Sequence, residues 1–282
     1  MLTFNHIGYL GRLGNQMFQF ASTLGVANRL GIEARFPIEN CISQNMTGPF
    51  DHNTGQNSYT KCDLLDCFNI TDEYFIPSAE IKPTGIYHER EFTFNPETES
   101  IPDNCTLFGY FQTEKYFSEY RNIILGQFSF KNEYYDIAAD YIKTIKESNK
   151  DLKLTSLHVR RGDYVYSPDH HPVCSLTYYL EATKTINELD HSKFLIFSDD
   201  IEWCKKVFIG DAYILSDLEN PYTEMCAMTL CDNNIIANSS FSWWGAWLNK
   251  NPDKIVISPS KWFGNAMNKD TSDVYCKDWI II

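Results

Sequence analysis

From residue 152 onward, short apolar segments alternate with longer amphipathic ones, and this alternation is the strongest constraint on the fold. Five segments are predicted strands: LTSLHV (154–159), FLIFS (194–198), AYILS (212–216), NNIIAN (233–238) and KIVIS (254–258). Four predicted helices separate them, at 175–189, 201–208, 222–231 and 240–250. Successive strands joined by crossover helices must run mainly parallel, with right-handed connections. The pattern therefore predicts a doubly wound α/β domain.

The first part of the chain begins with a similar unit. TFNHIGYL (3–10) is a predicted strand, and a turn containing Gly8, Gly11 and Gly14 follows it. Next comes a predicted helix with one apolar face, made by Met17, Phe20, Ala21, Leu24 and Ala27, and then a second strand at 32–36. Further strands are predicted at 85–94 and 105–111 and helices at 114–125 and 132–148, whereas 38–70 reads as a long loop. A polar stretch at 149–151 divides the chain into predicted domains 1–150 and 151–282.

The charge balance limits the ligands that such a protein can bind. With 37 acidic and 24 basic residues, the net charge of −13 argues against a broad surface for nucleic acid or anionic membrane. An anionic ligand must instead meet a local cluster of positive charge. No leader sequence and no apolar window of about 18 residues is found, so we expect a cytoplasmic protein. The nine cysteines lack C-x-x-C spacing and are predicted to be reduced core thiols.

A local cluster of positive charge follows the strand at 154–159. In SLHVRRGDYVYS (156–167), Arg160 and Arg161 lie at the carboxyl end of the strand, the edge at which parallel sheets bind ligands. A guanidinium is a permanently charged fork of donors that suits phosphate, so the pair indicates a diphosphate site. Two alternatives remain at this point: a salt bridge to Asp163, and an adhesion tripeptide formed by residues 161–163.

Two further segments fit a nucleotide diphosphate. In NSSFSWWGAWL (238–248), serines precede an apolar helix, whose first N–H groups can face a phosphate or be satisfied by ordinary capping. Glu224, at the start of the preceding helix, could accept hydrogen bonds from guanine, or could simply be favourable helix charge. Trp243, Trp244 and Trp247 are interpreted as core packing rather than as a sugar platform.

Several catalytic signatures are missing from the sequence. It contains no D-x-D, no G-x-x-x-x-G-K-[ST], no H-E-x-x-H and no G-x-S-x-G. A metal-chelated diphosphate and the common hydrolase schemes therefore lose support. A nicotinamide dehydrogenase is a weak alternative, since Gly11, Gly14 and Glu33 only imitate the dinucleotide fingerprint. A non-catalytic glycan-binding protein is another.

Taken in order, the motifs resemble a known family. GRLGNQMFQFA (11–21), HVRRGDY (158–164) and IIANSSFSWWGAWL (235–248), with GYFQTEKYF (109–117) and FSDDIEWCK (197–205), are similar to segments of bacterial α-1,2-fucosyltransferases, glycosyltransferase family 11. Members of that family transfer L-fucose from GDP-fucose to the 2-hydroxyl of a galactose. A fucosyltransferase of other linkage is the nearest alternative.

The resemblance implies a GT-B fold, in which two Rossmann-like domains face each other across a donor-binding cleft. The N-terminal domain would serve the acceptor and the C-terminal domain GDP-fucose. It also implies inverting transfer without a metal or other cofactor, with GDP-fucose as donor substrate and a galactose-terminated glycan as acceptor. Peripheral association with the inner face of the membrane is compatible with this assignment.

The resemblance further implies the site residues. Arg160, Asp163 and Asn15 are the candidates for catalysis, with Arg160 on the β-phosphate and Asp163 either the base or a partner that holds the arginines. The candidates for donor binding are His158, Arg160, Arg161, Gly14, Asn15, Gln16, Asp199, Glu224, Asn238, Ser239, Ser240, Phe241 and Ser242. The stretch CDNN (231–234) departs from the more basic or histidine-containing segment expected there.

Overall fold

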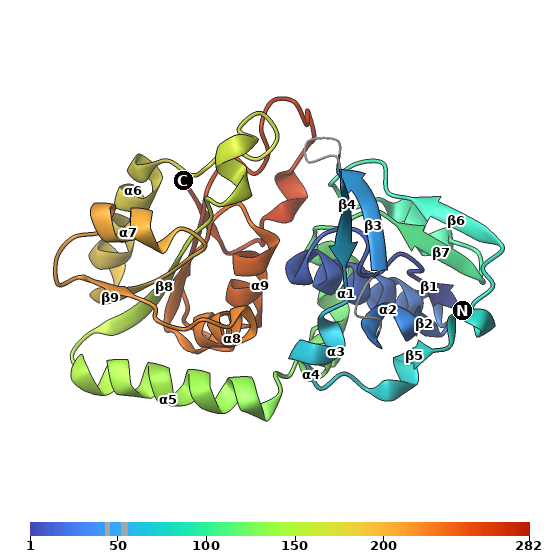
Figure 1. The fold of residues 1–282 in the computed structure, drawn as a ribbon, viewed down its shortest axis with the longest axis horizontal. Coiled ribbons are helices and arrows are strands. Elements are labelled where there is room, and N and C mark those ends of the chain that lie inside the picture. The colour runs from blue at the N-terminus through green and yellow to red at the C-terminus, as the bar shows by residue number, and fades with distance from the viewer. Residues whose placement is uncertain (43–45, 52–55) are drawn as a thin grey trace. The chain divides into compact units, whose positions relative to one another are not determined.

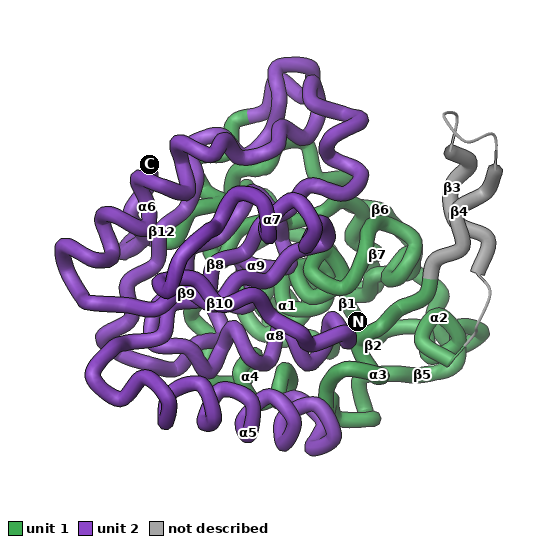
Figure 2. Tube along the Cα trace, turned by 60° about the vertical axis from the view of Figure 1, so that its left-hand side comes forward, with its two compact units in different colours: residues 1–129, 270–276 green, residues 130–269, 277–282 purple. Residues whose placement is uncertain are grey.

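Each half of the chain is built on its own parallel sheet (Figure 1). The computed structural model describes residues 1–42, 46–51 and 56–282. Unit 1 comprises residues 1–129 and 270–276, and unit 2 comprises residues 130–269 and 277–282 (Figure 2). The chain thus divides at residue 130 rather than at 151, because helix α5 (Asn132–Ser148) packs on helix α8 (Pro221–Leu230) of unit 2.

Unit 2 contains a six-stranded sheet in the order β10-β9-β8-β11-β12-β13, with every pair parallel. Its strands are β8 (Lys153–Val159), β9 (Ser192–Ser198), β10 (Tyr213–Leu215), β11 (Asn233–Ile235), β12 (Val256–Ser258) and β13 (Ile280–Ile281). The five predicted strands and the doubly wound arrangement are confirmed. Strand β13 was not predicted, because two residues are too short to produce a pattern.

Helices cover both faces of this sheet. They are α5, α6 (Leu176–Leu189), α7 (Ile201–Val207), α8 and α9 (Ser240–Leu248). On β9, Phe194 and Ile196 belong to a core cluster with α6 and α7, whereas Leu195 and Phe197 belong to a second cluster with α5 and α8. The alternation of side chains along the strands thus supplies both cores.

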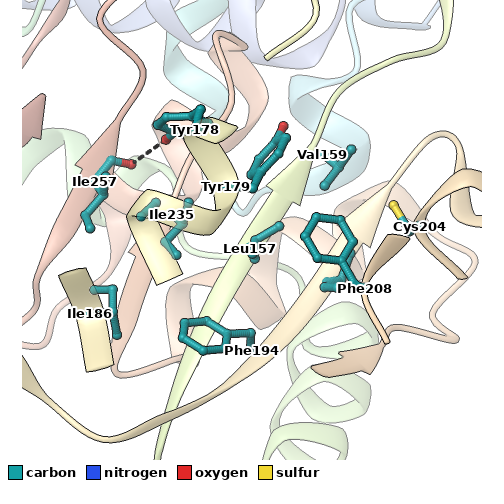
Figure 3. Packing of buried hydrophobic residues seen from close by; sticks show 12 residues of the cluster. Leu157, Val159, Tyr178, Tyr179, Ile186, Phe194, Cys204, Phe208, Ile235 and Ile257 are labelled. Carbon is teal, nitrogen blue, oxygen red and sulfur yellow. Dashed lines mark hydrogen bonds between the residues drawn. The ribbon is translucent and has the colours of Figure 1, made fainter. Parts of the chain in front are cut away.

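Figure 3 shows the first of these clusters, in which Leu157 of β8 and Ile235 of β11 lie near the α6 side chains Tyr178 and Tyr179. The Tyr178 hydroxyl donates to the carbonyl oxygens of Ile236 at 2.6 Å and Ile257 at 3.2 Å. These two contacts satisfy the Tyr178 hydroxyl inside the core and connect α6 to the ends of β11 and β12.

Helix α9 is buried from Ser242 to its last residue, Leu248. Trp243, Trp244 and Trp247 are at most 2% exposed, and the rings of Trp243 and Trp244 meet edge to face at 5.0 Å. The interpretation of these tryptophans as core is confirmed. Seven of the nine cysteines are buried, in agreement with their prediction as core residues.

Unit 1 contains a five-stranded parallel sheet in the order β5-β2-β1-β7-β6. Its strands are β1 (Leu2–Thr3), β2 (Ala34–Pro37), β5 (Phe75–Ile76), β6 (Gly85–His88) and β7 (Cys105–Phe108). Strand β1 was predicted to reach residue 10, but it ends at Thr3. A wide turn follows, in which Gly8 and Gly11 have φ angles of 87° and 83°. Such angles strongly favour glycine and interrupt an extended strand.

The segment 38–70, predicted as a loop, contains regular structure. It holds helices α2 (Glu39–Ile42) and α3 (Leu64–Cys67) and the antiparallel strands β3 (Met46–Asp51) and β4 (Gln56–Thr60). Residues 43–45 and 52–55 of the predicted loop lie outside the described residues. The helix predicted at 114–125 is divided into 3-10 turns at Glu114–Tyr116 and Ser118–Tyr120 and helix α4 (Arg121–Gln127). Across the described ranges of the chain, no helix has the length and apolarity to cross a bilayer.

Helix α1 (Leu13–Leu30) is the central helix of unit 1. Its predicted apolar face is confirmed, since Met17, Phe20, Ala21, Leu24 and Ala27 are at most 2% exposed. Gly25 lies against the end of the 3-10 turn Glu114–Tyr116. A Cβ atom added to Gly25 would stand 2.7 Å from Cα of Phe117 and closer still to the Tyr116 carbonyl oxygen. The helix can approach this backbone only because residue 25 has no side chain.

We expect Gly25→Ala to destabilise the protein by about 1 to 3 kcal/mol, because backbone atoms cannot move aside as a flexible side chain could. Gly126→Ala in α4 is the matched control, since nothing lies within 4 Å of its added Cβ. That change should be neutral or stabilising by up to about 1 kcal/mol. Chemical denaturation followed by circular dichroism measures both. Equal stability of the two variants would contradict the close approach.

Candidate active site

Charged side chains meet at the carboxyl edge of the unit 2 sheet. Arg160, Arg161 and Asp163 follow β8, and Asp199 and Asp200 follow its neighbour β9. The chain reverses or loops at each of these points, so the side chains point toward one another rather than along the strands. The structure therefore brings the predicted arginine pair and the predicted aspartate into one cluster.

Arg160 is held by two carboxylates. Its Nη1 atom donates to Oδ2 of Asp199 and its Nη2 atom to Oδ1 of Asp163, and its guanidinium carbon lies 4.9 Å from the centre of the Tyr164 ring. The side chain is 17% exposed. A guanidinium has five N–H donors, so these two bonds do not use all of them. Arg160 is thus fixed in direction and retains donors for a ligand.

Arg161 is held by a different carboxylate. Its Nε atom donates to Oδ2 of Asp200 at 2.9 Å, and its guanidinium lies over the Trp203 ring at 4.2 Å from the ring centre. The hydrogen bond from Arg161 lowers the pKa of Asp200. Oδ1 of the same carboxylate caps α7 by accepting from the Trp203 backbone N–H at 3.1 Å. The start of α7 thereby fixes the second arginine.

Asp199 links the two arginines through the main chain as well. Its Oδ1 atom accepts the backbone N–H of Arg161 at 2.8 Å. A Cβ atom on Gly162 would stand 2.5 Å from Oδ2 of Asp199, so only glycine allows the carboxylate to come so close. Neither Gly162 nor Trp203 was predicted as a residue of the diphosphate site, whereas residues 198–200 were expected at this sheet edge. The glycine after the arginine pair was the one available signal.

His158, on β8, lies beneath this cluster. It is 6% exposed, and burial, with a smaller contribution from the charge of Arg160, lowers its pKa to about 3. Its ring lies 5.6 Å from the Phe241 ring, and its Nδ1 atom has no hydrogen-bond partner among the described residues. The imidazole is therefore neutral at physiological pH and cannot contribute positive charge to an anion site.

Glu224, in the first turn of α8, is partly buried. Burial, and then the negative charge of Asp199, raises its pKa to about 7. Its carboxyl group is thus close enough to the arginine cluster to be affected by it, and it is about half ionised at neutral pH.

The segment 238–242 leads from β11 into α9. The Asn238 side chain is fully used, because Nδ2 donates to the carbonyl oxygens of Pro172 and Trp262 at 2.9 and 3.0 Å and Oδ1 accepts from Cys174. Ser242 is buried and its hydroxyl donates back to the carbonyl of Ser239 at 3.3 Å. These two residues hold the segment in place.

Ser239 is the N-cap of α9, and its side chain makes no capping bond. Ser240 and Phe241 are partly exposed. The first N–H groups of α9 and the hydroxyl of Ser240 are therefore the groups of the segment best able to meet a ligand, whereas Ser239 is buried.

In unit 1, the predicted residues 14–16 begin α1. Gln16 is 1% exposed, and its side chain joins the start of α1 to residues 61–63. Its Nε2 atom donates to the carbonyl oxygen of Lys61 at 2.8 Å, and its Oε1 atom accepts from the Asp63 backbone N–H at 2.7 Å. Gly14 is buried. Asn15 is partly exposed and accepts a hydrogen bond from Gln112 at 2.8 Å. Among the three, Asn15 is the side chain best placed to reach a ligand.

The sequence of this chain is similar to a family model and to known proteins. The family model "Glycosyl transferase family 11" matches residues 2–282. The chain is 31% identical to the O-antigen biosynthesis glycosyltransferase WbnK of Escherichia coli, over 93% of this chain and 96% of that protein. It is 29% identical to the α-1,2-colitosyltransferase of Escherichia coli, over 90% of each. Galactoside α-(1,2)-fucosyltransferase 2 of Sus scrofa is 24% identical, over 86% of this chain and 68% of that protein.

Solved structures show the same fold. POFUT1 in complex with GDP superposes with a TM-score of 0.53 at 13% identity, covering 91% of this chain and 97% of that one. NodZ α-1,6-fucosyltransferase soaked with GDP-fucose gives a TM-score of 0.52 at 13% identity, covering 88% and 91%. The predicted GT-B-like fold is confirmed. With the family model matching nearly every residue, the chain belongs to glycosyl transferase family 11.

Proposed function

We propose that this glycosyltransferase moves L-fucose from GDP-fucose to the 2-hydroxyl of a terminal galactose on a glycan, with inversion and without a metal ion. The observation that carries the proposal is the pair of guanidiniums fixed by carboxylates at the ligand-binding edge of unit 2. The names of the α-1,2-transferring relatives and the GDP-fucose soaked into the NodZ structure support the linkage and the donor.

Charge development explains the role of Arg160. As the bond from fucose C1 to the β-phosphate oxygen breaks, negative charge accumulates on the departing GDP. A guanidinium aimed at that oxygen stabilises the transition state more than the ground state. Because Asp163 and Asp199 already fix Arg160, little reorganisation is needed when the charge appears. Arg160 and Arg161 thus supply the positive charge that a divalent cation would otherwise provide.

Asp163 fits the role of a holding residue. Its carboxylate accepts a bond from Nη2 of Arg160, and taking a proton from the acceptor would remove the charge that strengthens this bond. We therefore assign Asp163 to the orientation of Arg160 and leave the base unassigned. Asn15, at the start of α1, is the unit 1 side chain that we propose for donor contact.

Glu224 fits the recognition of guanine. A carboxylate can accept from both N1–H and the exocyclic amine of guanine, and these donors favour its ionised form. The raised pKa of about 7 in the free protein then means that donor binding releases a proton whenever Glu224 is protonated. The first N–H groups of α9, beside Ser239 and Ser240, would contact the diphosphate.

A colitosyl donor is the second candidate, because a relative of 29% identity is named for that sugar. Colitose lacks the 3-hydroxyl of fucose, so the two donors differ by one polar group. A non-catalytic sugar-binding protein is not favoured: the three tryptophans that could form a platform are buried, and Arg161 of the adhesion tripeptide is engaged by Asp200 and Trp203.

The assay of the function uses purified protein, GDP-fucose and a panel of β-galactosides, with and without EDTA, and linkage analysis of the product. We expect α-1,2 transfer that EDTA does not change, because fixed guanidiniums neutralise the diphosphate. GDP-colitose in parallel distinguishes the second candidate. Absence of transfer to every galactoside, or loss of turnover in EDTA, would refute the proposal.

Arg160→Ala should lower kcat by about two to three orders of magnitude, because it removes a fixed donor from the developing charge. Arg90→Ala is the control, since Arg90 is a largely exposed arginine of unit 1. Steady-state kinetics gives kcat, and thermal unfolding verifies that both variants remain folded. If Arg160→Ala turns over as fast as Arg90→Ala, the phosphate role is wrong.

The affinity for GDP-fucose should be about tenfold weaker at pH 6 than at pH 8, because below pH 7 Glu224 must lose a proton to bind guanine. The diphosphate diester of GDP-fucose itself does not titrate in this range. Isothermal titration calorimetry without acceptor measures the dissociation constant. Glu224→Gln should abolish the dependence, and Glu219→Gln, an exposed neighbour, should retain it. A dependence that survives in Glu224→Gln would exclude this assignment.

A further inference from the structure

Unit 1 contains a pocket that none of the donor-binding residues lines. Its volume is about 340 Å³, and it lies where β1, β2 and β5 end. Asn5 and His6 follow β1, Pro37 and Asn40 mark the end of β2, and Ser78 follows β5. Because the three strands are parallel neighbours, these residues meet at the carboxyl edge of the sheet, the usual place for a ligand in such folds.

The lining of the pocket is uncharged in composition. Its residues include asparagine, histidine, tyrosine, proline, serine and isoleucine, and no Asp, Glu, Lys or Arg is among the described residues that line it. In a chain with 22% charged residues, and beside a unit 2 site built from arginines and carboxylates, this difference is informative. The pocket fits a neutral ligand, not a nucleotide diphosphate.

Two amide groups in the pocket have fixed directions. Asn40 is 7% exposed, and its Nδ2 atom donates to the carbonyl oxygens of Asn5 and Ile7, both at 3.0 Å. Among the described residues, no hydrogen bond engages its Oδ1 atom, which can accept from a ligand. Asn5 is oriented in the opposite sense, because its Oδ1 atom accepts from the Thr3 hydroxyl at 3.0 Å, and within the same described ranges its NH₂ group can donate to a ligand. A fixed acceptor beside a fixed donor suits the hydroxyl groups of a polyol.

Aromatic and aliphatic surfaces complete the lining. The rings of His6 and Tyr9 meet edge to face with centres 6.1 Å apart, and His6 rests on Phe108 at 5.2 Å. Pro37 and Ile81 add apolar surface. A pyranose presents both hydroxyls and apolar C–H faces, so it matches such a mixed lining better than a purely polar or purely apolar molecule does.

We propose that this pocket binds a neutral pyranose of the glycan acceptor, with Asn5 and Asn40 on its hydroxyls and His6 and Tyr9 on its C–H face. The identification of that sugar as the acceptor rests on the proposed function. The binding of a neutral sugar as such rests on the lining alone.

The kinetic test compares His6→Ala and Tyr9→Ala with His88→Ala. His88 is the matched control for His6. Like His6, it is exposed and packs on the Phe108 ring, at 5.3 Å, but it does not line the pocket. We expect KM for a β-galactoside acceptor to rise about tenfold in the two pocket variants. KM for GDP-fucose and the rate of its hydrolysis without acceptor should stay at the wild-type values. Acceptor KM values equal to that of His88→Ala, or a change in donor KM instead, would overturn the proposal.

The binding test needs no donor. Ser78→Trp fills the pocket from its exposed rim and keeps the backbone N–H bond from residue 78 to Glu39. Saturation-transfer NMR with methyl β-galactopyranoside and lactose should show transfer to the sugar in the wild type and in His88→Ala. The signal should be lost in Ser78→Trp, His6→Ala and Tyr9→Ala, with thermal unfolding unchanged in Ser78→Trp. If GDP-fucose is not a donor, only the proposed function fails, and this measurement still decides the pocket: equal signals in all variants would refute it.

Discussion

The candidate site depends on one carboxylate, that of Asp199. Two adjacent guanidiniums repel each other and would diverge into solvent without counter-charges. Asp199 binds the side chain of Arg160 and the backbone N–H of Arg161, and it lies so close to Gly162 that a Cβ atom there would displace the carboxylate. Its charge also contributes to the raised pKa of Glu224. Asp199 thus helps to orient Arg160, fixes the backbone at Arg161 and adds to the effect of burial on Glu224, whereas Asp200 and Trp203 fix the Arg161 side chain.

The second half of the fold could be predicted because its strands are buried on both faces. Continuous apolar runs such as 194–198, separated by amphipathic helices, have few other interpretations. Unit 1 was less predictable, because its strands are short and glycines with positive φ interrupt the apolar run after Thr3. The domain boundary was misplaced for a related reason: the apolar face of α5 shows that the helix is packed, but not on which sheet.

For the site, the sequence indicated which residues gather but not how their polar atoms are used. Arg160 and Arg161 could be identified because permanent charge at a strand end needs a partner. Gln16 and Asn238 lie in the same motifs, yet their side chains bind backbone groups of distant segments, such as Lys61 and Trp262, and the Ser242 hydroxyl bonds the carbonyl of Ser239 in its own segment. A motif cannot distinguish a residue that touches a ligand from one that holds the loop, because both must be specific amides or hydroxyls.

The two units have separate sheets and separate cores. Mutations in groups that share no partners combine almost additively. Substitutions around the uncharged unit 1 pocket therefore act on different contacts from those that orient the guanidiniums of unit 2. On the proposed roles, substitutions at the sheet edge of unit 1 change the choice of glycan while the proposed nucleotide contacts of unit 2 stay as they are.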